Sequence, residues 1–404
     1  MRKLQRTILH IDVNNAFLSW TAVEKLKQGE MLDIRTIPAV IGGDEASRHG
    51  IVLAKSMPAK QFGIKTGEPL FQARKKCPQI QVYPSNFAIY RKYSNELYQL
   101  FLEYTDKIER FSIDECFLDM TSFLRGRTIL EIAQEIKRRV KEELGFTVNI
   151  GIAHNKLLAK MASDFQKPDR IHTLYEEEIE KKMWTLPVIE LFMVGKRTLP
   201  KLEQMHIKTI GDLAHYDEQK LIKKFGKFGK TMWEYANGID FSEVNGKQEK
   251  PKGIGNSITL SEDMEDIDKI NEILLALVEQ VTYRLRKEKL VASVVNVQIK
   301  TKDFSVFSHQ RKLEMATDST KEIYQIAKEL LAILLKGRTI RLLGIRVDDL
   351  SDPSEKQISL FDVEKNEKQE KLDKTIDALK NKYGYNSVTR AGKMNLNHKM
   401  KFKE

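Results

Sequence analysis

The stretch Thr7-Ile-Leu-His-Ile-Asp-Val13 is short, apolar and rich in β-branched residues, which predicts a buried strand with Asp12 near its end. A second strand is predicted over Phe111-Ser-Ile-Asp-Glu-Cys-Phe-Leu-Asp119, and it carries Asp114 and Glu115. Pairing of these two strands would bring the three carboxylates together.

A cluster of three carboxylates is unstable without cations, because like charges at close range raise a pKa or recruit a divalent metal. All-oxygen ligands favour Mg²⁺ or Mn²⁺ over zinc. Two such ions about 3.5–4 Å apart can activate a hydroxyl and stabilise a leaving pyrophosphate. Spacing alone favours a simpler interpretation, in which Asp12 is a turn residue and Asp114 and Glu115 are an exposed pair, so the surrounding residues must decide.

The neighbouring segments predict an α/β layer around these strands. Thr147 to Ile152 is a third candidate strand, and Phe87 to Tyr104 fits a helix. Another helix is expected to begin near Thr128, because Thr128 and Glu131 have the spacing of a capping box. This order of elements indicates an antiparallel or mixed sheet covered by helices on one face.

The chain changes character after Lys167-Pro168. Short helices separated by glycine turns come first, and a polar connector follows from Asn237 to Gly255. A separate α/β domain is then predicted, with helices at Ile267–Lys287 and Lys321–Leu335 and strands at Val291–Lys300 and Thr339–Val347. From Ser351 onward we expect a largely flexible tail with one short helix, Leu372 to Lys382.

Composition limits the function further. The chain has 404 residues and a formal net charge of +11, with 31% charged residues, which favours a polyanionic partner. Its two cysteines, Cys77 and Cys116, show no disulfide or zinc spacing. No signal peptide is evident and no apolar run approaches membrane-spanning length, so we expect a cytoplasmic protein without a membrane partner.

Two of these segments resemble motifs of the Y-family translesion DNA polymerases, which include UmuC-like and polymerase IV-like enzymes. They are His10-Ile-Asp-Val-Asn-Asn-Ala-Phe17 and the segment from Phe111 to Asp119. The resemblance implies an α+β multidomain right-hand fold with a palm sheet, small fingers, a helix-hairpin-helix thumb and an α/β little finger. The implied boundaries are 1–15 and 86–174 for the palm, 16–85 for the fingers, 175–238 for the thumb, 239–252 for a linker, 253–350 for the little finger and 351–404 for the tail.

The same resemblance implies the catalytic chemistry. Asp12, Asp114 and Glu115 would hold two Mg²⁺ ions, with the main-chain carbonyl of Val13 as a further ligand and Mn²⁺ able to substitute. Many relatives carry a second Asp where this chain has Asn14, but that position is not one of the three expected carboxylates. The implied reaction is DNA-templated addition of deoxynucleotides to a primer 3′ end, in translesion synthesis and damage-induced mutagenesis.

Three segments resemble the family's nucleotide-binding groups. In Ser56-Met-Pro-Ala-Lys-Gln-Phe-Gly-Ile-Lys65, Lys60 stands where a phosphate-binding Arg is usual and Met57 where a Tyr is usual. Lys is a point charge that cannot grip bidentately, so phosphate binding differs from the usual pattern. Lys167, in the stretch from Gly151 to Pro168, would be the second triphosphate cation. Phe17 would exclude a ribose 2′-hydroxyl.

Contacts to DNA and to a partner follow from the remaining motifs. Glycine turns between short helices can bind phosphate through backbone N–H groups; the candidates are Gly195, Lys196, Gly226, Lys227 and Gly229. Arg311 belongs to a candidate basic sheet face on the little finger. For the second turn and for the sheet, glycines that only end helices and charges that only face solvent are equally weighted alternatives.

The tail segment Gln357-Ile-Ser-Leu-Phe361 closely resembles the bacterial sliding-clamp-binding peptide, with Gln357, Leu360 and Phe361 as contacts. We expect a monomer that binds primer-template DNA, a deoxynucleoside triphosphate and the clamp. Within the family, the tail and the Met57-Pro58 variant look most like the UvrX-type proteins of Gram-positive bacteria and phages.

Two other functions compete with this one. A nucleotide cyclase also uses a palm-like sheet with paired acids, but it has no use for glycine hairpins or a clamp peptide. A non-catalytic DNA-binding protein would use the basic excess and the hairpins, but it has no need of Asp12, Asp114 and Glu115.

Overall fold

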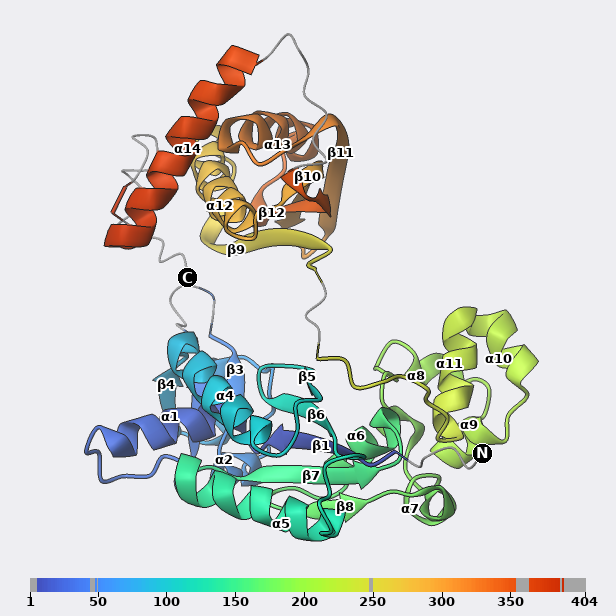
Figure 1. The fold of residues 1–404 in the computed structure, drawn as a ribbon. Helices are drawn as coiled ribbons and strands as arrows, with labels where there is room; N and C mark the ends of the chain where they lie inside the picture. Colours follow the sequence, from blue (N-terminus) through green and yellow to red (C-terminus); the bar gives the residue numbers. More distant parts are fainter. Residues whose placement is uncertain are drawn as a thin grey trace. The chain divides into compact units, whose positions relative to one another are not determined.

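The computed structural model describes residues 6–43, 48, 50–246, 250–353, 363–385 and 387–388. The chain divides into two compact units, one formed by Met1–Gly43 with Gly50–Gln248 and the other by Asp44–His49 with Glu249–Glu404. The division after Gln248 lies within the expected linker, while the finer domain boundaries stay predictions. Each unit is described separately below (Figure 1).

A five-stranded mixed sheet is the centre of the first unit, in the order β5-β6-β1-β7-β8. Its central strand β1 is buried along its whole length and pairs antiparallel with β6 and with β7, whereas β7 and β8 are parallel. The strands are β1 (Ile8–Val13), β5 (Ile108–Arg110), β6 (Glu115–Asp119), β7 (Val148–Ala153) and β8 (Ile171–Thr173).

Helices cover both faces of this sheet, so the expectation of one covered face is wrong. Alternation along β1 sends Leu9 and Ile11 into a core that also contains residues of α1 (Ala16–Lys27), α4 (Phe87–Leu102) and α5 (Ile129–Arg139). Ile8 points the other way and packs against α6 (Lys156–Asp164). The predicted capping box is confirmed, because Thr128 and Glu131 cap α5 reciprocally.

A second, three-stranded sheet lies next in the chain, in the order β3-β2-β4. Its strands are β2 (Ala39–Gly42), β3 (Val52–Lys55) and β4 (Gln81–Pro84). Two short helices, α2 (Met57–Gln61) and α3 (Leu70–Lys76), contribute Ala59 and Leu70 to its small core. Ser56 caps α2 by accepting a hydrogen bond from the Ala59 N–H.

Short helices follow, as expected after Pro168. They are α7 (Ile179–Lys182), α8 (Leu199–Glu203), α9 (Ile210–Ala214), α10 (Glu218–Phe225) and α11 (Lys227–Ala236). Their buried residues share one core with α6, which joins this helical part to the five-stranded sheet within the first unit.

The second unit contains a four-stranded antiparallel sheet in the order β11-β10-β12-β9. Its elements are β9 (Gly253–Met264), α12 (Ile267–Lys287), β10 (Val291–Thr301), β11 (Val306–Thr317), α13 (Thr320–Leu335) and β12 (Ile340–Ser351). Buried residues of α12 and α13 pack with the inward residues of the sheet in a separate core. The two predicted helices and two predicted strands are present, but β9 and β11 were missed.

A long helix, α14 (Val363–Tyr383), corrects the expectation of a largely flexible tail with a short helix. Arg286 of α12 donates from Nε and Nη2 to the Asp377 carboxylate at 2.6 and 3.0 Å. The Thr320 N–H donates to Asp373 at 3.2 Å, and the Tyr283 hydroxyl donates to Asn381 at 2.5 Å. These contacts dock α14 on the second unit.

Candidate active site

The end of β1 brings two predicted acids together. Asp12 lies opposite Glu115 in the β1–β6 register and opposite Asn149 in the β1–β7 register. Asp12 is 6% exposed, while the Glu115 side chain is 20% exposed. The central strand therefore places a buried carboxylate beside a partly buried one.

Asp114 is not in a strand, contrary to the prediction. Residues 111–114 form the connection between β5 and β6, because the N–H groups of Phe111 and Ser112 both donate to the Glu115 carbonyl, at 3.0 and 3.2 Å. The Asp114 carbonyl accepts from the Val13 N–H at 3.1 Å, so the turn is attached to the end of β1. The Asp114 carboxylate accepts from the Ser112 hydroxyl at 2.6 Å.

Helix α6 supplies Lys160 to these acids because it lies very close to the sheet. A Cβ at Gly151 of β7 would stand 1.9 Å from the Ala159 carbonyl oxygen, so only glycine permits this approach. Gly151 pairs with His10 in the register. Lys160 and Ser163 of α6 consequently reach the face of β1 that carries His10 and Asp12.

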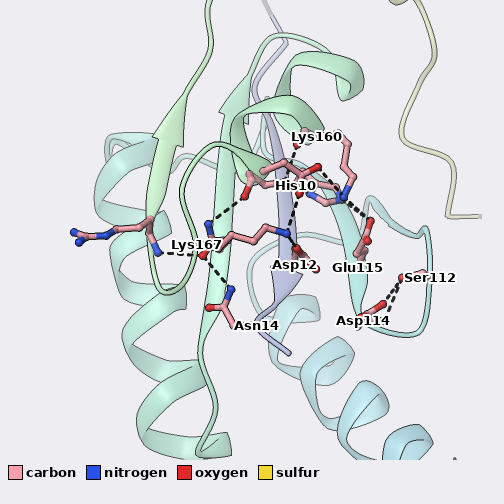
Figure 2. A network of polar contacts seen from close by, with 12 residues as sticks. His10, Asp12, Asn14, Ser112, Asp114, Glu115, Lys160 and Lys167 are labelled. Carbon is pink, nitrogen blue, oxygen red and sulfur yellow. Dashed lines mark hydrogen bonds and ion pairs between the residues drawn. The ribbon is translucent and has the colours of Figure 1, made fainter. Parts of the chain in front are cut away.

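Figure 2 shows the resulting polar network. Lys160 Nζ lies 3.0 Å from Glu115 and 3.3 Å from Asp164, and Lys167 Nζ lies 2.8 Å from Asp164 and also contacts Asp12. His10 Nε2 lies 3.2 Å from Glu115, and its Nδ1 lies 2.8 Å from the Ser163 hydroxyl oxygen. Each buried carboxylate therefore faces a lysine.

Burial and these contacts separate the pKa values of the two paired acids. Burial raises the pKa of Asp12 to about 6, although Lys167 opposes the shift. Burial also raises the pKa of Glu115, but the His10 hydrogen bond and the Lys160 charge outweigh it and lower the pKa to about 2. Burial lowers the pKa of His10 to about 4, so His10 is neutral at pH 7. Because ionised Glu115 can only accept, His10 Nε2 carries the proton and donates to it.

Asn14 has a structural position beside the acids. Its side-chain oxygen accepts from the Thr147 hydroxyl at 3.0 Å and from the Asp169 N–H at 2.9 Å, while its amide donates to Asn149 at 3.0 Å. These bonds connect the end of β1 with β7 and with the segment that follows Lys167. The amide thus attaches the segment after Lys167 to the end of β1 without adding a charge.

One cavity of about 420 Å³ gathers the acids and the predicted nucleotide-binding residues. Its lining includes Asp12, Val13, Asp114, Glu115, Phe17, Met57, Lys60 and Lys167. Lys55, Thr66, Lys160 and Asp164 also line it, and none of them is among the predicted site residues. The sequence Val52-Leu-Ala-Lys55 has no polar and apolar alternation, so it held no signal that places Lys55 in the cavity.

Phe17, the predicted sugar contact, is held by its aromatic neighbours. The Phe17 ring stacks on Tyr90 with centroids 4.5 Å apart, and it meets Phe87 edge-on at 5.8 Å. Phe17 is the second residue of α1, which begins directly after Asn15; the φ of 48° at Asn15 turns the chain from the strand into the helix. The ring therefore has a fixed place in the cavity wall.

The donor set fits divalent metal ions. All three acids offer oxygen ligands to one cavity, and two ammonium groups already lie against Asp12 and Glu115. Burial raises the pKa of Asp12 although Lys167 lies against it, so additional positive charge would favour the ionised form of Asp12. In the present side-chain positions, no group of three His, Cys, Asp or Glu residues within the described part of the chain is close enough to hold a metal. Asp114 turns toward Ser112 instead (Figure 2).

The predicted DNA contacts lie outside this cavity. Gly195, Lys196, Gly226 and Lys227 are exposed in the helical part. Gly229 is not: it is buried within α11, its N–H donates to the Gly226 carbonyl, and a Cβ there would stand 2.2 Å from the Leu221 carbonyl oxygen. Gly229 thus allows α10 and α11 to pack closely; its role as a phosphate contact stays a prediction. Arg311 of β11 donates to Glu329 at 2.6 Å.

The predicted clamp-binding residues Gln357, Leu360 and Phe361 lie outside the described residues. Among the described ones, no helix is long and apolar enough to cross a membrane.

Solved structures share this fold. A Y-family polymerase chimera of Dbh and Dpo4 superposes with a TM-score of 0.76 at 24% identity, covering 86% of this chain and 99% of that one. The DinB structure from Sulfolobus solfataricus gives 0.56 at 25% identity, covering 85% and 98%. The fold and the acidic cavity together define the class of Y-family polymerases.

Sequence relatives specify the family. The model of the impB/mucB/samB family matches residues 11–164, that of its C-terminal domain matches 251–360, and a model described as the DNA polymerase-iota thumb domain matches 190–240. DNA polymerase IV of Clostridium acetobutylicum is 52% identical over 96% of this chain and 98% of its own length. DNA polymerase IV of Acetivibrio thermocellus is 40% identical over 96% and 97%.

The chain belongs to the impB/mucB/samB family of Y-family DNA polymerases. It is a DNA-directed DNA polymerase of the translesion type, as the resemblance implied. Its placement near the UvrX-type proteins stays a prediction, since these relatives carry the name DNA polymerase IV.

Proposed function

We propose that the cavity at the end of β1 is the site of deoxynucleotide addition to a primer, with Asp12, Asp114 and Glu115 as the catalytic acids. One observation carries this proposal: the three acids share a single cavity with Phe17, Lys60 and Lys167. Acids that hold metal and cations that hold phosphate are the two requirements of phosphoryl transfer.

The acids and the Val13 carbonyl would hold two Mg²⁺ ions, or Mn²⁺ in their place. When bound, such ions activate the attacking hydroxyl and stabilise the leaving pyrophosphate. Asp114 leaves Ser112 to join the other two carboxylates, and Lys167 leaves Asp12. Because Lys167 also lies 2.8 Å from Asp164, it has a second partner near the cavity from which it can reach phosphate.

The remaining residues orient the nucleotide. Lys60 and Lys167 bind its triphosphate, and the fixed ring of Phe17 lies against its sugar and excludes a 2′-hydroxyl. Met57, 40% exposed, borders the cavity but offers no hydrogen-bond donor. The phosphates therefore depend on ammonium groups more than on hydroxyl or guanidinium contacts.

The proposed contacts to the DNA duplex lie outside the cavity. Gly195 with Lys196 and Gly226 with Lys227 present exposed backbone and cations to the phosphates of the duplex. Arg311 adds positive charge on the second unit when its guanidinium group leaves Glu329 and binds a phosphate of the DNA. The segment 357–361 recruits the sliding clamp through Gln357, Leu360 and Phe361, and the protein acts as a monomer in the cytoplasm.

Primer extension with Mg²⁺ tests the assignment of the acids. Asp114→Ala is expected to reduce templated incorporation at least about 100-fold, because losing a charged metal ligand removes several kcal/mol of transition-state stabilisation. Asp106→Ala is the matched control, since Asp106 is an exposed acid just before β5 and outside the cavity. Equal rates for the two variants would rule out Asp114 as a catalytic acid.

A further inference from the structure

A third lysine lies on the wall formed by β3 and α2. Lys55 is the last residue of β3, and along this strand Val52 and Ala54 are buried whereas Leu53 and Lys55 are more accessible. Lys55 lines the cavity together with Lys60 and Thr66. The motif that predicts Lys60 assigns no role to Lys55.

This lysine differs from the two lysines on the side of the acids. Lys160 and Lys167 are already paired with carboxylates. Lys55 Nζ instead donates to the Thr66 hydroxyl at 3.3 Å, and within the described residues it makes no ion pair with a carboxylate at 4.0 Å or less. Thr66 thus orients the ammonium group without neutralising it.

The surroundings of Lys55 favour an anion. Burial lowers the pKa of Lys55, the charge of Lys60 lowers it further, and Glu68 opposes the shift. Glu68 is itself engaged with Lys76 at 2.6 Å. Two like charges side by side on a cavity wall are unfavourable until a polyanion lies between them.

We propose that Lys55 binds the triphosphate of the incoming nucleotide and shares its charge with Lys60. The inference rests on the proposed function of the cavity and extends it. Lys60 is a point charge, and Met57 adds no donor, so one ammonium group faces several phosphate oxygens on this wall. Lys55 supplies the second cation there.

Steady-state incorporation at saturating DNA tests this role with three variants. Lys55→Gln is expected to raise the KM for deoxynucleotide about tenfold, the usual effect of losing a charge-assisted hydrogen bond, with a much smaller change in kcat. Lys55→Arg should recover most of the loss. Lys65→Gln is the control, because Lys65 is exposed on the same segment and does not line the cavity.

Inorganic tripolyphosphate identifies the contacted group. Its inhibition constant against deoxynucleotide should rise in Lys55→Gln by the same factor as the KM, and the DNA dissociation constant should not change. An unchanged KM, an unchanged inhibition constant or a weakened DNA complex would each overturn the role of Lys55. Full activity of Asp114→Ala would instead contradict the proposed function, so the two failures are distinguishable.

Discussion

Asp12 combines burial with a negative charge, which has a measurable effect on stability. Its pKa of about 6 lies above the usual 3.8, so the native state binds more protons than the unfolded state between these values. The favourable contribution of protonated Asp12 is complete below pH 3.8 and is lost as the pH rises through 6. Asp12→Asn is therefore expected to stabilise the metal-free protein at pH 7.5 by about 1–3 kcal/mol.

Denaturant unfolding in EDTA at pH 7.5 and at pH 4 measures this difference, which should shrink toward zero at the lower pH. Asp106→Asn, at an exposed position, should change stability little at either pH. A less stable Asp12→Asn protein at pH 7.5 would show that the contact with Lys167 outweighs the burial of the carboxylate.

The proposed steric role of Phe17 leads to a second prediction about a single residue. Phe17→Ala should lower discrimination against ribonucleotides at least about tenfold, because the truncated side chain leaves room for a 2′-hydroxyl. Single-turnover incorporation of matched ribo- and deoxynucleotides measures the ratio. Phe71→Ala, which removes a ring that is 54% exposed and does not line the cavity, should leave it unchanged.

Sequence motifs predicted residues that line the cavity, both the acids and the candidate nucleotide contacts. Pairing of β1 with β6 is enough to bring Asp12 and Glu115 together. The contacts of Lys160 depend on the close approach of α6 at Gly151, and the turn position of Asp114 depends on hydrogen bonds to Glu115. Neither feature is visible in hydrophobic periodicity.

Among the elements, the α10–α11 hairpin depends on a buried glycine. Gly229→Ala should destabilise the first unit by about 2 kcal/mol or more, because the clash with the Leu221 carbonyl exceeds the roughly 1 kcal/mol that alanine gains in a helix. Thermal unfolding measures the loss.

Gly195→Ala is a comparison variant, because its Cβ would meet nothing within 4 Å. The stability of this variant should therefore stay unchanged, while its affinity for DNA should fall.

The strands that the sequence analysis missed, β9 and β11, are the two edges of their sheet. An edge strand pairs on one side only, and many of its side chains face solvent, so polar residues interrupt the apolar alternation. For this reason the start of β9, which contains Gly253, Gly255 and Asn256, resembles a polar connector in the sequence. The central strands β10 and β12 contain more buried apolar residues, so their sequences predict strands.

At the scale of the whole molecule, each unit has its own hydrophobic core. A chain ending at residue 248 should therefore fold alone and retain nucleotide binding. Its DNA affinity should be lower and less dependent on salt than that of the full chain, because the cations of the second unit are missing. Circular dichroism melting and DNA titrations at several salt concentrations measure both effects; absence of a cooperative melt would contradict independent folding.

The docking of α14 has a consequence for clamp recruitment. Strand β12 ends at Ser351, and α14 is held against α12 and α13 through Asp377 and Asp373. In the sequence, the predicted clamp-binding segment 357–361 lies between these two elements, so both of its neighbours belong to the second unit. We therefore expect a clamp bound by this segment to stay close to the second unit, at a correspondingly high local concentration.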